Sequence, residues 1–383
     1  MIPTRLVPHA LAYAAYYTTV GVLLPYLSAY FQSRGFDATE IGLLLSFGPL
    51  FAAVTPIAVG YAADRLGRPR AIMRIALAGA SLAMIALAST RSFSAAVAVM
   101  LVYAIFQPPV LVLLEAATLH ELQARGGAYA RVRMFGSIAF VVAAFGIGFF
   151  LDARVAERTA ALAWVPRFAA LALFAQLVTS LFLPAHGKVD RAVDPRAALR
   201  LLRIPGLVPL LVTATLHWIA MAPYHTLFAV HVHDLGLPDR VVGMSMALGA
   251  SAEVLLMLFS PRLSFSPRTL LLAAYASGIV RWAASGLVTS GALLVAIQAL
   301  HGLTFGAFYL AAIATLQKLI PSELRATGQG LFIAMVFGLG GALGTILAGT
   351  VAELGGGQAA FLTSAGVSLL LTLIWWRCPR ELN

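Results

Sequence analysis

The chain has little charge and almost no cysteine. Only 11% of its 383 residues are charged, whereas soluble domains carry about 25%. Its one cysteine, Cys378, excludes a disulfide within the chain. No polar block is long enough to form a soluble domain, 61% of the residues are hydrophobic, and the mean hydropathy is +0.90. These scarcities indicate an integral membrane protein.

Long hydrophobic runs, by contrast, are abundant. A spanning helix needs about 20 mainly apolar residues. The runs are continuous and rich in Leu and Ala, which favours helices over strands of alternating hydropathy. We predict an all-α membrane protein with twelve spans, at 8–31, 40–63, 71–90, 94–115, 133–151, 164–184, 206–230, 241–260, 267–288, 290–317, 328–350 and 357–377.

The lysines and arginines fall mainly on one side of the predicted spans. Of the 26, 19 lie on the side that holds both termini, six lie on the other, and Arg281 lies inside a span. Cytoplasmic loops carry the excess of Lys and Arg. We therefore expect both termini in the cytoplasm, in a bacterial-type inner membrane. The net charge of +11 then reflects orientation and not nucleic-acid binding.

The most polar connection divides the chain into similar halves. It reads AHGKVDRAVDPRAALRLLRIP over 185–205. We expect a six-helix bundle at 1–185, a cytoplasmic linker at 186–205 and a second six-helix bundle at 206–383. Such duplication is typical of transporters with a binding site between the repeats. The alternative is that a basic loop in the middle of the chain is only a loop.

A cluster of charge follows the second predicted span. The pattern Gly-x-x-x-Asp-Arg-x-Gly-Arg is formed by Gly60, Asp64, Arg65, Gly67 and Arg68. Gly60 would permit close helix packing, and Gly67 a positive φ in a two-helix turn. Asp64 suits a helix N-terminus, while Arg65 and Arg68 suit carboxylates or helix C-terminal carbonyls. The alternative is that the arginines only enforce orientation.

This pattern and the six-plus-six layout resemble the major facilitator superfamily. The resemblance covers the whole chain and implies the major facilitator fold. In that family the turn steadies one of two alternating states. The resemblance therefore implies a gating role for the turn and not substrate binding.

Ionisable residues inside the predicted spans are few, and such residues are functional candidates by default. Glu253, Arg281 and His301 lie at mid-span in three successive helices. A buried carboxylate loses hydration, and a nearby arginine stabilises its charge. Movement of Arg281 relative to Glu253 would let the carboxylate take up or release a proton, which His301 could relay. The alternative is a static polar cluster that joins three helices.

Two further charges flank one cytoplasmic turn. Glu115 ends the fourth span and Arg133 opens the fifth. The two helices can bring them together as an ion pair. The alternative is two solvated residues at the membrane edge.

Polar and aromatic residues accompany these charges. Gln298, Thr304, Phe305 and Phe308 stand at offsets of −3, +3, +4 and +7 from His301, which predicts one stripe on its helix. Such a stripe suits an aromatic, partly polar solute. Further aromatic residues are candidates to line the cavity, with helix packing as the alternative for each: Tyr13, Tyr16, Tyr224 and Trp282.

Two segments resemble the lactose-permease-like proton symporters, and more closely their phenylpropionate permease branch. They read LLEAATLHELQARGGAYARVRMFGS and GIVRWAASGLVTSGALLVAIQALHG. The resemblance implies substrate or proton roles for Glu115, Arg133, Glu253, Arg281 and His301. The sugar-carrying relatives have a carboxylate where this chain has Thr304, and a tryptophan where it has Phe140. Both departures argue against galactoside transport and leave Glu253 as the candidate proton site.

We therefore predict proton-coupled symport of a small organic solute by alternating access. A pair of arginines suits a carboxylate, so an aromatic or organic acid is favoured. The alternatives are a sugar or nucleoside symporter and a proton-driven exporter; the fifth span lacks the proline expected of an exporter. A membrane enzyme is disfavoured because no catalytic or metal-ligand motif occurs. The expected partners are the solute, a proton and the bilayer, with no cofactor or metal, and the expected state is a monomer.

Overall fold

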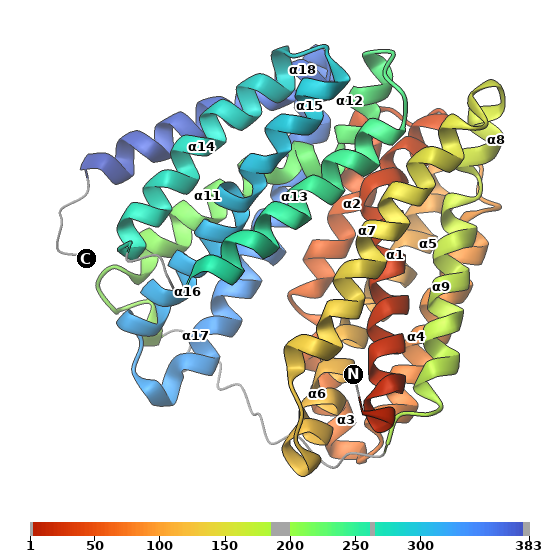
Figure 1. Cartoon of the computed structure of the whole chain (residues 1–383), viewed down its shortest axis with the longest axis vertical. Helices are drawn as coiled ribbons and strands as arrows, with labels where there is room; N and C mark the ends of the chain where they lie inside the picture. Colours follow the sequence, from red (N-terminus) through yellow and green to blue (C-terminus); the bar gives the residue numbers. More distant parts are fainter. Residues whose placement is uncertain (1–2, 185–199, 261–264, 378–383) are drawn as a thin grey trace. The chain divides into compact units, whose positions relative to one another are not determined.

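The computed structural model describes residues 3–184, 200–260 and 265–377, apart from the side chains of Asp64, Glu323 and Ala326. The chain forms two compact units, Met1–Ala192 and Val193–Asn383 (Figure 1). The predicted linker lies outside the described residues as far as Leu199, and so does Cys378.

The N-terminal unit is a bundle of helices. Its helices are α1 (Val7–Ser33), α2 (Ala38–Ala52), α3 (Thr55–Leu66), α4 (Pro69–Leu87), α5 (Phe93–Phe106), α6 (Pro108–Arg125), α7 (Tyr129–Asp152), α8 (Arg158–Leu162) and α9 (Val165–Ser180). Short 3-10 turns occupy Thr4–Leu6 and Val155–Glu157. Helix α1 packs against both α7 and α9 (Figure 1).

The C-terminal unit is a second helical bundle. Its helices are α11 (Leu207–Thr226), α12 (Phe228–Asp234), α13 (Arg240–Phe259), α14 (Pro267–Leu287), α15 (Gly291–Ile297), α16 (Phe308–Leu319), α17 (Arg325–Phe332) and α18 (Gly340–Arg377). Short 3-10 turns occupy Gln298–Leu300 and Ser322–Leu324. Two π-helical segments, Gly302–Ala307 and Ile333–Leu339, join α15 to α16 and α17 to α18.

Among the described residues, ten helices are long and apolar enough to span a bilayer. A bent pair, Val155–Leu162 with Val165–Ser180, adds an eleventh span across a 49° bend. One of the ten, Thr327–Arg377, is 51 residues long, more than twice the length that a single crossing needs. It loses helical geometry at Gly355 and Gly356, between the spans predicted at 328–350 and 357–377. It therefore contains both, which brings the total to the predicted twelve.

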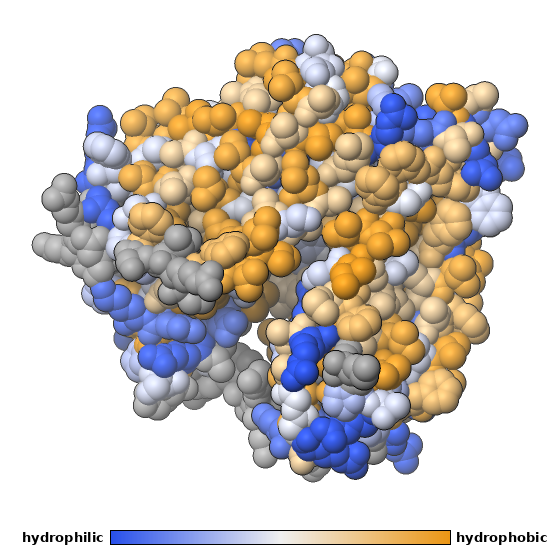
Figure 2. All heavy atoms as spheres, viewed as in Figure 1, coloured by the Kyte–Doolittle hydropathy of each residue, from blue (hydrophilic) through white to orange (hydrophobic). Residues whose placement is uncertain are grey.

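Apolar side chains cover much of the outer surface of each unit. Figure 2 shows hydrophobic residues over broad areas of the visible face, with hydrophilic residues gathered towards the ends of helices. Val142 and Leu171 are each 65% exposed, and Val280 is 56% exposed. Soluble monomers rarely expose such large apolar patches. The chain is a multi-pass membrane protein.

The glycine turn after α3 has the predicted geometry. Gly67 ends α3 with φ +62° and ψ 24°, a left-handed conformation that glycine adopts without steric cost. Pro69 then opens α4, at a position where its missing N–H leaves no helical hydrogen bond unmade. Helix α2, which precedes α3, begins with a capping box between Asp37 and Glu40.

Among the described residues, Gly60, Arg65 and Arg68 do not make the contacts expected of them. Gly60 is half-exposed, and a Cβ there would meet nothing within 4 Å. Among the described residues it is therefore not a site of close helix packing. Arg65 and Arg68 are exposed, and neither has a partner among the described side chains. The side chain of Asp64 lies outside the described residues. Two other arginines bind carbonyl oxygens at the end of a helix instead. Arg70 donates to Leu183 O at 3.2 Å, and Arg74 donates to Ser180 O at 3.2 Å.

Buried hydroxyls connect the helices of the N-terminal unit. Tyr26 donates to Ala144 O of α7 at 2.7 Å, and Tyr30 to Leu87 O of α4 at 2.7 Å. Ser81 of α4 donates to Ala170 O of α9 at 3.1 Å. Away from water, polar groups must find partners inside the protein, so these bonds fix the helices side by side.

Glycines bring α18 against α11 in the C-terminal unit. A Cβ on Gly340 would lie 3.0 Å from Thr215 Cγ2, and one on Gly344 2.8 Å from Ala222 Cβ. Both glycines stand on one face of α18, four residues apart, as close packing of membrane helices requires. An apolar core that includes Tyr275, Phe308 and Trp375 joins α11, α14, α16 and α18 in this unit.

Candidate functional site

Arg281 lies at the centre of a polar network inside the C-terminal unit. It belongs to α14 and is fully buried. Its Nε donates to Gln298 Oε1 at 2.9 Å, and its Nη1 donates to His301 Nδ1 at 3.0 Å and to Thr304 Oγ1 at 2.6 Å. Helix α14 thus presents one guanidinium to three residues of the next predicted span.

Aromatic rings cover the guanidinium. Its Cζ lies 4.3 Å from the ring centroid of Tyr224 and 4.3 Å from that of Trp282. Trp282 in turn stacks on Phe361. Arg281 Nη2 is buried and has no hydrogen-bond partner among the described residues. Cation–π contact stabilises the charge, but the unmade hydrogen bonds at Nη2 cost free energy unless another group supplies an acceptor.

His301 links this arginine to Glu253. Its Nε2 lies 3.8 Å from Glu253 Oε2, while its Nδ1 faces Arg281. A guanidinium only donates, so Nδ1 must accept, and the proton of neutral His301 is on Nε2, facing the carboxylate. The Glu253 side chain is 25% exposed and that of His301 12%. The three ionisable residues predicted at one depth therefore form a chain that runs from a buried guanidinium to an accessible carboxylate.

The π-helical segment Gly302–Ala307 brings α13 close to this chain. A Cβ on Gly302 would lie 2.9 Å from Ala252 O, and one on Gly306 3.7 Å from Glu253 Cγ. Gly302 therefore lets the backbone of α13, and Glu253 with it, approach His301, whereas a Cβ on Gly306 would make only an ordinary contact. A π-helical turn inserts an extra residue into a helix and occurs often at functional sites.

The same segment alters the predicted stripe. His301 and Phe305 stack at 5.4 Å with their planes 8° apart, and Phe305 stacks on Tyr309 at 6.0 Å. Phe308 does not continue the stripe, because it packs on His217 in the apolar core. The π-helical turn contains one extra residue, which rotates the following side chains about the helix axis. Tyr309 therefore lies on the face of the helix where an uninterrupted α-helix would place Phe308.

His217 is a site residue that sequence reasoning missed. It is fully buried in α11, and its Nε2 lies 2.7 Å from the carbonyl oxygen of Thr304. A carbonyl only accepts, so Nε2 carries the hydrogen and donates it. The bond holds the π-helical segment by its backbone while the Thr304 hydroxyl binds Arg281. The only sequence signal was a histidine within an apolar span.

We expect His217→Leu to lower the melting temperature of the protein. The Thr304 carbonyl would lose its donor, which costs about 1–3 kcal/mol of folding stability when the acceptor stays buried. Differential scanning calorimetry of the purified protein measures the loss. His217→Asn retains an N–H donor and should restore part of the loss. Equal losses in both variants would show that the imidazole ring and not its hydrogen bond matters.

The N-terminal unit holds a second cluster of charge. Tyr129 donates to Glu115 Oε1 at 3.2 Å, and Arg133 donates to Ser137 Oγ at 3.4 Å. The Arg133 guanidinium lies 3.8 Å from the ring centroid of Tyr17. Among the described residues, the expected Glu115–Arg133 ion pair is not formed, because aromatic partners occupy each group.

Three further predicted residues belong to this unit. Tyr13 is fully buried, with its ring edge-on to Tyr129 at 6.3 Å. Tyr16 accepts a hydrogen bond from Gln107 at 3.2 Å. Phe140 lies seven residues beyond Arg133 and is half-buried. Its carbonyl oxygen lies 2.6 Å from the position of a Cβ on Gly21, so α7 meets α1 closely there.

Two bundles of long apolar helices, one of which buries Arg281 among polar and aromatic residues, define a multi-pass membrane fold. The model of the MFS_1-like family matches residues 7–363, and the chain belongs to that family. It is therefore a transporter of the major facilitator superfamily, and it has the predicted fold.

Curated relatives align over most of their length. The maltose permease of Geobacillus stearothermophilus is 25% identical over 374 residues, covering 95% of this chain and 93% of that protein. The probable 3-phenylpropionic acid transporter of Escherichia coli (strain K12) is 27% identical over 362 residues, covering 89% of each. The putative nucleoside transporter YegT of the same strain is 24% identical over 337 residues, covering 84% and 78%.

Solved structures share the fold. The nucleoside transporter NupG superposes with a TM-score of 0.86 at 19% identity, covering 98% of both chains. The human organic anion transporter MFSD10 (TETRAN) gives a TM-score of 0.62 at 19% identity, covering 98% of this chain and 100% of that one.

Proposed function

We propose that this transporter carries out proton-coupled symport of a small aromatic or organic acid by alternating access. Arg281 is the proposed anion-binding group, and Glu253 the proposed proton site. Gln298, His301, Tyr224 and Trp282 orient and shield the guanidinium. Both termini are proposed to lie in the cytoplasm.

The observation behind this proposal is the unpartnered Nη2 of Arg281. Every other edge of the guanidinium has an acceptor, and aromatic rings lie over it. A carboxylate at Nη2 would supply charge-assisted hydrogen bonds that the described protein groups do not. Because Arg281 is fully buried here, the solute would reach it in a state in which neighbouring side chains have moved apart.

Proton coupling is proposed from the chain that ends at Glu253. The carboxylate is accessible while Arg281 is not. An anion bound to Arg281 would offset the positive charge of this arginine, which stabilises the Glu253 carboxylate and disfavours a proton on His301, and would thereby favour a bound proton. Solute binding and proton binding would then support each other, as symport requires.

The N-terminal unit is proposed to supply a second set of contacts. Arg133 is held by Tyr17, and Glu115 by Tyr129, and the rings of Tyr13 and Tyr16 contact these tyrosines. Phe140 is a further proposed contact. The Gly60–Arg68 turn is proposed to regulate the conformational change. The exposed guanidinium groups of Arg65 and Arg68 are available for partners that differ between states.

The proposal is tested by ligand binding to the purified protein. The names of the relatives supply three probes: 3-phenylpropionate, maltose and a nucleoside. We expect 3-phenylpropionate to raise the melting temperature, because a ligand that binds the native state stabilises it. Uptake of the same acid into proteoliposomes should then require an inward proton gradient. Stabilisation by maltose or the nucleoside alone would contradict the proposed substrate class.

A further inference from the structure

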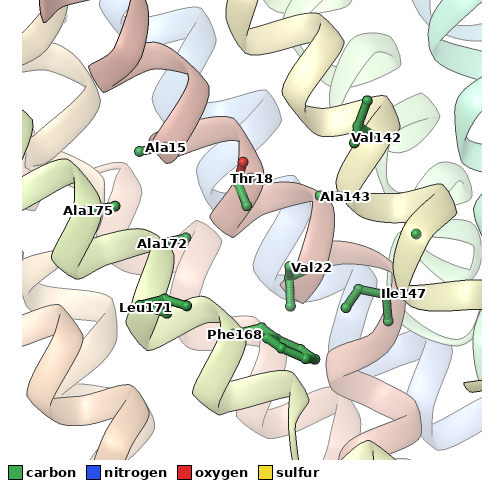
Figure 3. Close-up of a pocket in the computed structure, with 11 residues that line it drawn as sticks. Ala15, Thr18, Val22, Val142, Ala143, Ile147, Phe168, Leu171, Ala172 and Ala175 are labelled. Atoms are coloured by element: carbon green, nitrogen blue, oxygen red, sulfur yellow. The ribbon is translucent and has the colours of Figure 1, made fainter. Parts of the chain in front are cut away.

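Two cavities flank α9 in the N-terminal unit. The first, of about 330 Å³, lies between α1, α7 and α9, with Thr18, Gly146 and Phe168 in its lining (Figure 3). The second, of about 440 Å³, lies between α4 and α9, with Ser81, Ile85 and Phe174 in its lining. Leu171 lines both, so the cavities are neighbours on either side of one helix.

Both cavities open on an apolar outer face. Arg167, Leu171 and Phe174 are spaced by four and three residues, so they form one stripe along α9. Leu171 is 65% exposed and Phe174 54%. In a bilayer this face contacts hydrocarbon, and an apolar hollow left empty there would forfeit dispersion contacts. Acyl chains are the occupants that a bilayer supplies.

The second cavity is cationic at the end where Arg167 lies. Arg167 is the one ionisable residue among the described residues that line either cavity. It is exposed, its Nη1 donates to Ala163 O at 3.1 Å, and its guanidinium lies 5.2 Å from the ring centroid of Trp164. Tryptophan and arginine together are typical of the headgroup level of a membrane.

A second arginine reaches the same end. Arg34 donates to the carbonyl of Ala88, a residue of the second cavity, at 3.3 Å. The nearest acidic residues along the chain from Arg34, Asp37 and Glu40, serve as the cap of α2. Two guanidinium groups therefore lie where a lipid phosphate would sit above two apolar hollows.

We propose that the cavities beside α9 hold the two acyl chains of one anionic phospholipid, whose phosphate binds Arg167. Leu171 separates the chains, and Arg34 adds positive charge at the headgroup. This site is independent of Arg281 and Glu253 and does not depend on the transported solute.

The test compares lipids on the detergent-purified protein. Phosphatidylglycerol should raise the melting temperature and remain bound in native mass spectrometry, and phosphatidylcholine should do so less. Arg167→Gln should weaken phosphatidylglycerol binding about 5-fold, since each basic residue near anionic lipid contributes about 1 kcal/mol. Gly146→Leu should remove the retained lipid, because a Cβ there meets open space and its side chain would fill the first cavity without a clash.

Arg154→Gln is the matched control. Arg154 follows the end of α7, packs on Phe150 at 4.3 Å and lines neither cavity. The control should bind phosphatidylglycerol like the unaltered protein. Equal binding of the two lipids, an equal loss in Arg154→Gln, or full retention in Gly146→Leu would overturn the proposal. Binding of glycerol phosphate as strongly as the lipid would show that the hollows play no part.

Discussion

Arg281→Gln is expected to lower the affinity for 3-phenylpropionate by at least about 30-fold, because removal of one partner of a buried, hydrogen-bonded charge pair costs 2–5 kcal/mol or more. Glutamine keeps a hydrogen-bond donor but has neither the charge nor the fork that matches a carboxylate. Titration calorimetry measures the loss directly. The amide of the same acid, which lacks the charge, should bind the unaltered protein and the variant with similar, weak affinity.

Arg268→Gln provides the control for this experiment. Arg268 lies in the same helix, but its guanidinium donates to the carbonyls of Trp375 and Trp376 and not to the network. Its replacement should leave affinity for the acid unchanged. The melting temperature without ligand shows whether each variant is folded. An Arg281→Gln protein that is folded and binds the acid as tightly as before would contradict the proposed anion site.

Glu253→Gln is expected to abolish concentrative uptake while exchange of solute persists. The amide resembles the protonated carboxyl group in shape, but it cannot release a proton. A proton gradient could then no longer drive the solute against its own gradient. The solute concentration inside proteoliposomes should therefore rise only to the concentration outside. Counterflow, which needs only solute binding and the conformational change, should continue and become insensitive to pH.

Glu353→Gln is the matched control for coupling. Glu353 is an exposed carboxylate of α18, far along the chain from the network. Its variant should accumulate solute like the unaltered protein. Accumulation against a gradient by Glu253→Gln would place the coupling proton elsewhere, whereas loss of both uptake and counterflow would indicate a role in solute binding.

Hydropathy was sufficient to predict the membrane helices. Each bilayer crossing needs about the same length of apolar chain, so a run of Leu and Ala identifies a span without knowledge of its neighbours. The break at Gly355 and Gly356 also falls between two predicted spans. Gly67 was predictable because a positive φ is a local property of the backbone. Gly60 was not, since close packing depends on which helix lies opposite.

The candidate site was predicted in part. An ionisable residue in hydrocarbon is costly, so Glu253, Arg281 and His301 stood out from their surroundings. Their order in space, with His301 between the other two, depends on side-chain directions in three helices. The bond from His217 to the Thr304 carbonyl was not predictable beyond a histidine within an apolar span, because a hydrogen bond to the backbone of another helix leaves no pattern in the sequence.

By itself, the sequence determined the class of protein, the positions of the membrane helices and the residues whose burial needs an explanation. These follow from the cost of placing each residue type in hydrocarbon, which is a property of local composition. Only the tertiary structure decided that Arg133 packs on Tyr17 and not on Glu115. It also decided that Tyr309, and not Phe308, continues the aromatic stripe after the π-helical turn. The same holds for Arg281 Nη2, which has no acceptor among the described residues. Those outcomes depend on helix register and on distances between elements, which no local pattern encodes.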